Sequence, residues 1–190
     1  MKRKALAAAM AAALALALAS PGLALGKKRF LKLCRAGDAE ELRAELESDP
    51  NFVRSWLDNE GETPLMTAAE KTRNPEVIRV LLAAGADVND QDEDDETPLM
   101  YAMDDYANIG VVRALLEGGA NVHLRDEKNR TALMHALKEH AGPDVVNALL
   151  DAGSDVNARD YEGLSVLDYA RRCSELHGTE TMRRLEAAGQ

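Results

Sequence analysis

Thr63-Pro64-Leu65-Met66 is a short stretch that recurs along this chain at a constant spacing. It returns as Thr97-Pro98-Leu99-Met100, as Thr131-Ala132-Leu133-Met134 and, in altered form, as Ser165-Val166-Leu167-Asp168. Each copy lies 34 residues after the one before it. A fixed period in this range is typical of a repeat protein, because one unit cannot bury its own apolar face and must stack against its neighbours. The spacing therefore predicts a stacked repeat fold, and it disfavours an enzyme because such stacks present surfaces rather than enclosed pockets.

Residues 58–91 show how one unit is predicted to fold. Thr63 follows a turn and is a favourable helix cap, and Pro64 suits the first helical position, where no amide donor is needed. A second helix is expected to begin near Pro75, with apolar residues recurring on one face. Gly85 then ends this helix in a left-handed conformation. Two short helices and a turn in each unit predict an all-α repeat.

The turn before each first helix carries a residue type that tolerates a positive φ. The four positions, again 34 residues apart, are Gly61, Asp95, Asn129 and Gly163. We therefore expect the four turns to share one backbone shape, although their side chains differ.

Residues 81–89, Leu-Leu-Ala-Ala-Gly-Ala-Asp-Val-Asn, and the Thr-Pro-Leu helix together resemble the ankyrin repeat. The resemblance covers about residues 27–190 and implies an ankyrin solenoid of helix-turn-helix units with β-hairpin-like fingers. The family unit is commonly about 33 residues long, and the extra residue here falls between the two helices. The family usually has His after Thr-Pro-Leu, and we expect apolar packing of methionine instead. The residues at that position are Met66, Met100, Met134 and Asp168.

The two ends of the chain depart from the repeat and are expected to cap the stack. The first unit lacks the Thr-Pro-Leu stretch. In the last unit Glu186 falls where Leu82 lies in a full repeat, as expected of a face that meets water. The predicted division is a signal peptide at 1–26, an N-terminal capping repeat at 27–62, three ankyrin repeats at 63–96, 97–130 and 131–164, and a C-terminal capping repeat at 165–190.

The first 26 residues differ in composition from the rest. Basic residues at 2–4 precede an Ala/Leu run at 5–19, and a Ser-Pro-Gly break follows. This order is that of a secretory signal peptide, cleaved after Ala19 or Gly26. An uncleaved membrane anchor is the alternative, although the run is shorter than the roughly 20 residues that a span requires. We expect a bacterial protein that is periplasmic or secreted after cleavage.

Export would make the chain more acidic. It holds 23 Lys and Arg against 33 Asp and Glu, a formal net charge of −10. Removal of residues 1–26, which contain three basic residues and no acidic ones, changes this charge to −13. Nucleic acids and anionic membranes attract basic surfaces, so this balance disfavours both as partners. We expect a monomer that binds a protein partner with a basic patch.

The remaining residues carry no recognisable catalytic or metal-binding motif. Cys34 and Cys173 belong to opposite ends of the predicted stack, so we expect free, half-buried thiols rather than a disulfide. Cys173 and His177 are four residues apart, but a thiol nucleophile also needs an orienting group and an oxyanion site. The acidic run at 90–96 lacks the Gly and Glu that a calcium loop requires, so we interpret it as a solvated finger tip. We expect no catalytic residue, no metal and no cofactor.

Positions that vary between repeats mark the expected recognition surface. In the ankyrin family, partners usually engage the finger tips and the exposed side of the first helix, which line the concave face. The resemblance thus implies that Tyr101 and Tyr169 are exposed anchors, since tyrosine is enriched in interface hot spots; the alternative is that they only cover the inner face. Trp56 is expected to pack in the N-terminal cap. The predicted partner-binding residues are Thr67, Tyr101, Tyr106, His135 and Tyr169 on the helices, and Asn59, Glu60, Glu93, Asp94, Glu127, Lys128 and Tyr161 on the fingers.

The predicted function is a non-enzymatic protein–protein interaction module of the bacterial envelope that binds through an acidic concave face and its finger tips. An inhibitor or immunity protein and a scaffold both fit, and the sequence does not choose between them. Two alternatives stay open, a thiol-dependent enzyme that uses Cys173 and His177, and a membrane-tethered structural protein that keeps residues 1–26.

Overall fold

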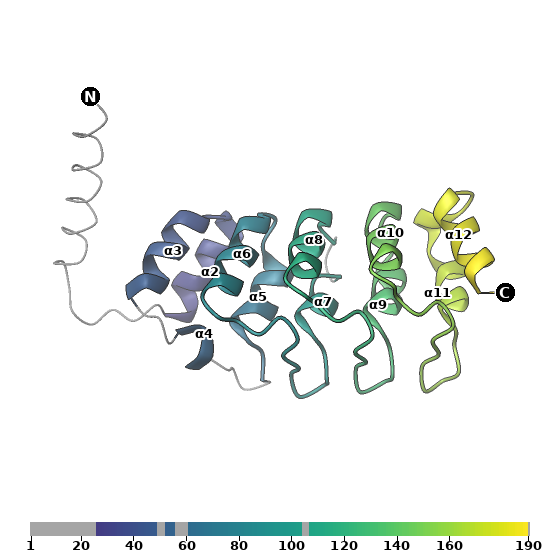
Figure 1. Ribbon diagram of the computed structural model, residues 1–190, viewed down its shortest axis with the longest axis horizontal. Helices are drawn as coiled ribbons and strands as arrows, with labels where there is room; N and C mark the ends of the chain where they lie inside the picture. The colour runs from purple at the N-terminus through teal and green to yellow at the C-terminus, as the bar shows by residue number, and fades with distance from the viewer. Residues whose placement is uncertain (1–25, 49–51, 56–60, 104–106, 190) are drawn as a thin grey trace, which may run out of the picture.

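The computed structural model describes residues 26–48, 52–55, 61–103 and 107–189. Within these ranges the chain is a row of helix pairs, stacked from the N-terminal to the C-terminal end (Figure 1). The described residues contain no β-strand, and the one isolated β-bridge among them pairs Arg159 with Ser165. The predicted all-α repeat fold is confirmed.

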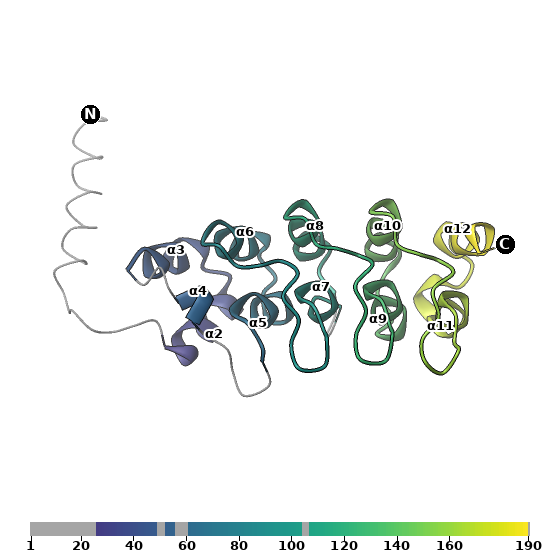
Figure 2. The ribbon, with the colours of Figure 1, turned by 60° about the horizontal axis from the view of Figure 1, so that its bottom comes forward.

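The helices form two layers, one from the first and one from the second helix of each unit (Figure 2). The first layer holds α2 (Lys27–Ala36), α5 (Pro64–Lys71), α7 (Pro98–Tyr101), α9 (Ala132–Lys138) and α11 (Val166–Arg172). The second layer holds α3 (Ala39–Ser48), α6 (Pro75–Ala83), α8 (Ile109–Glu117), α10 (Pro143–Asp151) and α12 (Glu180–Ala188). Short helices α4 (Phe52–Ser55) and η1 (Ser174–Leu176) follow α3 and α11. Among the described residues, none of these helices has the length and apolar character that a membrane span needs.

Side-chain caps begin α5, α7 and α11. The Thr63 hydroxyl accepts the N–H of Met66 at 3.3 Å, and Ser165 and Asp168 form a reciprocal capping box. Met66, Met100 and Met134 are buried in the apolar core, as predicted. The Met66 sulfur accepts the N–H of Thr63 at 3.3 Å, so this side chain completes a capping box besides packing in the core.

The turn residues adopt the predicted left-handed backbone. Gly61, Asp95, Asn129 and Gly163 have φ values of 78°, 60°, 64° and 81°. Gly85, with φ at 92°, ends α6 in the same region of backbone space. The shared turn shape is therefore confirmed at all four positions, and it sets the direction in which each loop leaves the stack.

Leu, Val, Ala and Met side chains fill the core between the two layers. Cys34 and Cys173 are free, as predicted, but both are fully buried rather than half-buried. Cys34 lies on the buried face of α2 beside Phe30 and Leu33. Burial raises the pKa of the Cys34 thiol to about 12, so it is a packing group and not a reactive thiolate.

Candidate protein-binding surface

Loops that we call fingers project from the first layer of helices (Figure 1). The second, third and fourth fingers comprise residues 91–96, 125–130 and 159–164, at the same 34-residue step as the helices. Most of the first finger, with Asn59, Glu60 and Trp56, lies outside the described residues, as does Tyr106. The predictions for these four residues stay predictions.

An aspartate closes the turn of each described finger. In the third finger, Asp126 Oδ1 accepts the backbone N–H of Lys128 at 2.9 Å and of Arg130 at 2.7 Å. Asp92 and Asp160 make the same two bonds to the residues two and four positions later, at 2.8–3.0 Å. Because the carboxylate satisfies two backbone donors of the loop, the finger holds its shape without strand pairing.

The other oxygen of the same aspartate ties the finger to the helix that follows. Asp92 Oδ2 accepts the Tyr101 hydroxyl at 2.7 Å, and Asp160 Oδ2 accepts the Tyr169 hydroxyl at 2.7 Å. For the third finger, His135 of α9 takes the place of the tyrosine, and its Nε2 atom lies 2.9 Å from Asp126 Oδ2. Each of these contacts joins two residues nine positions apart, so one device anchors all three fingers.

This anchoring overturns the expectation that the helix column is exposed. Thr67, Tyr101, His135 and Tyr169 are buried, with 3%, 9%, 4% and 9% of their surface exposed. The tyrosines turn toward the finger because a buried hydroxyl needs a hydrogen-bond partner, and the finger carboxylate supplies it. Burial, together with the hydrogen bond to Asp160, raises the pKa of Tyr169 to about 12. The alternative interpretation, that these residues cover the inner face, is the one that the structure supports.

Sequence reasoning missed the three finger aspartates. The signal was present, because an Asp recurs at 92, 126 and 160 and is followed nine residues later by Tyr or His. The first of these lies inside the acidic run at 90–96, where it was counted as part of a solvated tip. Its carboxylate instead faces inward and shapes the loop.

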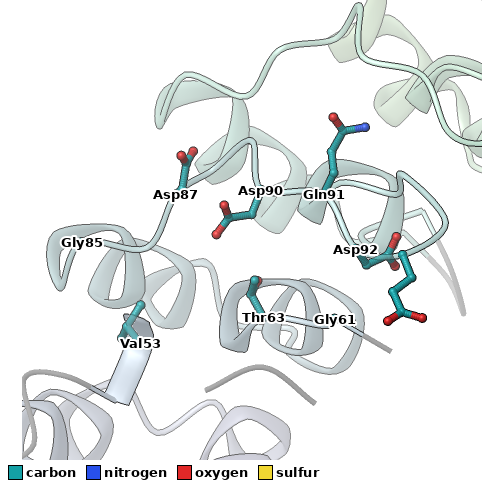
Figure 3. A pocket seen from close by; sticks show the side chains of 9 residues that line it. Val53, Gly61, Thr63, Gly85, Asp87, Asp90, Gln91 and Asp92 are labelled. Carbon is teal, nitrogen blue, oxygen red and sulfur yellow. The ribbon is translucent and has the colours of Figure 1, made fainter. Parts of the chain in front are cut away.

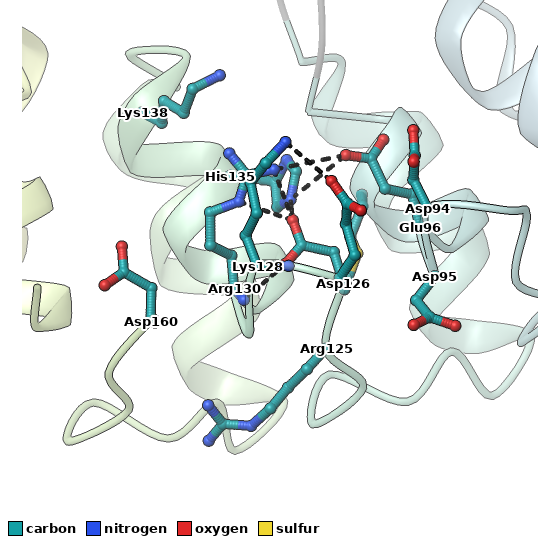
Figure 4. Close-up of polar contacts among 12 residues, drawn as sticks. Asp94, Asp95, Glu96, Arg125, Asp126, Lys128, Arg130, His135, Lys138 and Asp160 are labelled. Carbon is teal, nitrogen blue, oxygen red and sulfur yellow. Dashed lines mark hydrogen bonds and ion pairs between the residues drawn. The ribbon is translucent and has the colours of Figure 1, made fainter. Parts of the chain in front are cut away.

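The third finger adds a buried ion-pair cluster (Figure 4). The side chain of Asp126 has no exposed surface, and its Oδ2 lies 2.6 and 2.7 Å from the Nη2 and Nε atoms of Arg130. Glu96 of the second finger lies 3.7 Å from Arg130 and 3.9 Å from His135. Burial alone would raise the pKa of Asp126, but the hydrogen bonds from His135 and Arg130 outweigh it and hold the pKa well below its usual range.

The same cluster brings metal-ligand chemistry together. The ligand atoms of Glu96, Asp126 and His135 all lie within 4.8 Å of one another. However, the Arg130 guanidinium already places a positive charge 2.6 Å from Oδ2 of Asp126. The cluster is therefore complete with arginine as its cation, and its role in the fold is to hold the third finger against α9 and the second finger.

Backbone hydrogen bonds join the second finger to the third, and the third to the fourth, in one register. The N–H of Glu127 donates to the carbonyl of Asp94 at 2.8 Å, and the N–H of Tyr161 donates to the carbonyl of Lys128 at 3.1 Å. The donors are equivalent positions of successive repeats, and so are the acceptors. The described finger tips thus form a laterally bonded row rather than independent loops.

Side chains at a second position reinforce this row. Gln91 Nε2 donates to the carbonyl of Asp95 in its own finger at 2.7 Å and to that of Arg125 in the next finger at 3.3 Å. Arg125 repeats the pattern, donating to the carbonyls of Asn129 at 3.2 Å and Arg159 at 3.3 Å. The backbone of the row is therefore fixed from within, and the outward side chains are carried on a preformed support.

The outward side chains differ strongly from finger to finger. Glu93, Asp94 and Asp95 are all exposed on the second finger. On the third finger, the exposed Glu127 and Lys128 form an ion pair at 3.1 Å. On the fourth, Tyr161 has 77% of its surface exposed and is the one exposed large hydrophobic residue in the described part of the chain. The predicted finger residues that the structure describes are therefore available to a partner.

An open cavity of ≈ 610 Å³ lies beside the base of the second finger (Figure 3). Four carboxylate side chains are among those that line it, from Asp87, Asp90, Asp92 and Glu93. Burial raises the pKa of Asp90, and the charge of Asp87 adds to this. Negative charge is thus concentrated on this finger and its base.

The side chains of Cys173 and His177 contact different backbone carbonyls. A spacing of four residues would place both on one face of a continuous helix. However, α11 ends at Arg172, before either residue. The buried Cys173 sulfur lies 3.9 Å from the carbonyl of Ala141, whereas His177 is exposed, with Nε2 3.0 Å from the carbonyl of Arg171. Burial also raises the pKa of the Cys173 thiol, which disfavours the thiolate that a nucleophile needs.

Stacked helix pairs with a row of projecting fingers define a repeat protein that presents a surface. The family model described as ankyrin repeats (3 copies) matches residues 12–126 and 74–160, which together cover most of the chain. The chain belongs to the ankyrin repeat family, whose members are generally protein–protein interaction modules and typically not enzymes. No curated protein matches the sequence. The first family match begins inside the segment predicted to be a signal peptide, and that segment stays a prediction.

Proposed function

We propose that this ankyrin repeat protein is a non-enzymatic module that binds a protein partner through a basic patch docked on its second finger. The observation that carries the proposal is the unpaired acidic surface of that finger. Glu93, Asp94 and Asp95 are exposed, and their carboxylates form no ion pair with any described residue. Asp87 and Asp90 extend this surface along the cavity at the base of the finger.

Two properties of the finger row support binding. The backbone of the second finger is held by Asp92 and by its bonds to the third finger, so little conformational entropy is lost when a partner docks. The clustered carboxylates also attract a basic surface from a distance and speed its encounter. Both the rate and the selectivity of binding are then set by this finger, while the buried residues of the helix column support it.

The proposal includes export from a bacterial cytoplasm. It rests on the basic residues at 2–4, the Ala/Leu run at 5–19 and the Ser-Pro-Gly break that follows. Mass spectrometry of the mature protein tests it, with an amino terminus at Ser20 or Lys27 as the expected result. A retained Met1 would instead support the membrane-tethered alternative. Inhibition of a toxin or enzyme and scaffolding both remain compatible with such a binding module.

Charge reversal on the second finger tests the binding proposal. The purified wild-type protein first captures its partner from envelope extract, and association rates are then measured at low and high salt. Glu93→Lys with Asp94→Lys should slow association about tenfold and remove most of its salt dependence. Glu162→Lys is the matched control, because residue 162 holds the position of Asp94 on the fourth finger, and it should change the rate less than twofold.

Two results would sink the proposal. If the doubly reversed variant captured the same partner at the wild-type rate, the second finger would not be the docking site. Capture of a partner with a uniformly acidic surface would refute the basic patch.

A further inference from the structure

The fourth finger is the last that the structure describes, and no other described finger lies against its outer edge. It has the internal bonds of the other fingers, because Asp160 N donates to the carbonyl of Leu164 at 3.1 Å and Gly163 N to that of Asp160 at 3.1 Å. The corresponding bonds of the third finger are 3.0 and 2.9 Å long. Its backbone therefore presents the same donors and acceptors, but no further finger follows in the described chain (Figure 1).

In the second and third fingers, one backbone carbonyl and one side-chain donor on this edge bond to the next finger. The equivalent groups of the fourth finger make no such bond among the described residues. The carbonyls of Asp94 and Lys128 each accept an N–H from the next finger, and Glu162 holds their position on the fourth. Gln91 and Arg125 each donate to a carbonyl of the next finger. At the same position the Arg159 guanidinium bonds only the Gly163 carbonyl of its own finger, at 2.7 Å, among the described residues.

We propose that the outer edge of the fourth finger binds an extended segment of a partner protein, which adds to the row where a fifth finger would lie. This surface is separate from the acidic second finger and goes beyond the function proposed above. Here the partner offers the backbone N–H and C=O groups of an extended segment rather than a basic patch.

The existing contacts between fingers define what such a segment must offer. The third finger presents the carbonyl of Arg125 and the N–H of Glu127 to the second finger, and the fourth presents the carbonyl of Arg159 and the N–H of Tyr161 to the third. In both pairs the two groups lie two residues apart. An extended chain directs the carbonyl of one residue and the N–H of the residue two positions later to the same side. Three consecutive extended residues therefore supply the whole set.

Tyr161 gives this edge a side-chain anchor. It occupies the position of Glu93 and Glu127, which places its exposed ring beside the third residue of an added segment. Tyrosine is enriched in binding hot spots, and the edge carries neither the proline nor the lysine that proteins use to block strand addition. We therefore expect a segment with an apolar residue at its third position.

A synthetic peptide with the sequence of residues 157–164 serves as the probe, because this sequence makes the same contact with the third finger inside the protein. Titration into the labelled protein, followed by NMR, should give saturable shifts confined to the amides of Tyr161, Glu162 and Gly163 and to the Arg159 side chain. The control peptide carries a methyl group on the tyrosine nitrogen, which removes the N–H that would reach the Glu162 carbonyl. It should bind at least tenfold more weakly.

Protein variants sharpen the test. Tyr161→Ala should weaken binding about tenfold, or about 1.4 kcal/mol. Arg159→Gln should change it less than threefold, because Gln91 makes the corresponding two bonds on the second finger. Glu93→Lys should leave peptide binding unchanged, so failure here is distinguishable from failure of the basic-patch proposal.

Three outcomes would overturn the inference. The first is the absence of shifts at about 5 mM peptide, a concentration at which even a millimolar Kd is visible. The second is equal binding of the methylated peptide. The third is a set of shifts centred on the second finger.

Discussion

The second and third fingers share one backbone and use their charges in opposite ways. Asp92 and Asp126 close the two turns with the same pair of backbone bonds. In the third finger, the buried aspartate is neutralised by Arg130 and hydrogen-bonded to His135. In the second, the aspartate needs only a neutral tyrosine hydroxyl, and the remaining carboxylates face solvent.

This difference separates shape from recognition. The repeated aspartate and the left-handed turn residue fix the loop in both fingers, so their variable residues are free to differ. Variation in the third finger turns charge inward and locks it against the second finger through Glu96. Variation in the second finger leaves negative charge on the surface, where a partner can meet it. The third finger, whose Arg130 neutralises its own aspartate, thus has a structural role. The second finger beside it presents a charged surface.

Removal of the third-finger aspartate should have the largest effect on stability. Asp126→Ala leaves Arg130 and His135 buried without their carboxylate, which costs about 3–5 kcal/mol in the free energy of unfolding. Asp92→Ala removes the acceptor of two loop amides and leaves the Tyr101 hydroxyl with only Glu62, at 3.3 Å, and should cost about 1–3 kcal/mol. Urea denaturation of the two variants measures the difference.

Asp94→Ala is the control for this comparison. Its side chain is exposed and pairs with no described residue, so the change should stay within about 0.5 kcal/mol of wild type. Equal losses for the Asp92 and Asp126 variants would contradict the distinction between a neutral and an ionic anchor.

Acid titration should reveal the ionic anchor separately. His135 and Arg130 hold the pKa of Asp126 below its usual value of about 4, against the opposing effect of burial. A carboxyl whose pKa is lower in the folded than in the unfolded chain adds stability that is complete above about pH 4 and is lost as the pH falls through the folded value. The free energy of unfolding of Asp126→Asn should therefore fall less steeply than that of wild type below about pH 4.

Urea midpoints at a series of pH values from 5 downward provide the measurement. Parallel curves for the two proteins would mean that Asp126 contributes nothing to the acid sensitivity. Asp92→Asn, measured in the same series, shows how much of any change comes from loss of a loop-closing carboxylate alone.

Local rules predicted much of this fold, and contacts between distant residues account for what they missed. Asp95 and Asn129 adopt positive φ as predicted, because that preference belongs to the residue and its place in the turn. Tyr101 was expected to be exposed because a helix face alone does not show that a loop will fold over it. Its burial depends on Asp92, which lies nine residues earlier and reaches it through the finger.

The hydrogen bonds between neighbouring fingers could not be predicted from the sequence, for another reason. The bonds between Glu127 and Asp94 and between Tyr161 and Lys128 join backbone atoms, which leave no mark on the choice of side chain. The fingers themselves followed from the repeat, but their lateral bonding required the three-dimensional arrangement. The open outer edge of the fourth finger is visible only once that bonding is known.

Loss of a tyrosine hydroxyl should have a smaller effect than loss of the aspartate that accepts it. Tyr169→Phe leaves Asp160 with its two loop bonds and removes one buried hydrogen bond, for a cost of about 1–2 kcal/mol. The pKa of Tyr169 is raised to about 12, so its contribution is complete below about pH 10 and is lost as the pH rises through 12. Wild type should therefore lose part of its advantage over Tyr169→Phe between these values, as thermal denaturation across the range will show. A difference that stays constant up to pH 12 would contradict the contact.

The smallest expected effect on stability is the difference between replacing Thr97, after the second finger, and Thr131, after the third. Thr97, after the second finger, accepts the N–H of Met100 at 3.3 Å and caps α7. Thr131, after the third, is buried too, but its hydroxyl has no hydrogen-bond partner among the described residues. Thr97→Val should cost about 1 kcal/mol, the usual loss for a helix cap. Thr131→Val, which removes an unpaired buried hydroxyl at nearly constant volume, should be neutral or stabilise the protein by up to about 1 kcal/mol.

Thermal denaturation of these two variants gives the most sensitive check of the comparison, because the wild-type residue, its burial and its place after a finger are the same at both sites. A cost of about 1 kcal/mol at both positions would mean that Thr131 caps α9 as Thr97 caps α7. A gain at Thr131 would show instead that α9 is held by the cluster of Asp126, Arg130 and His135 without help from its cap.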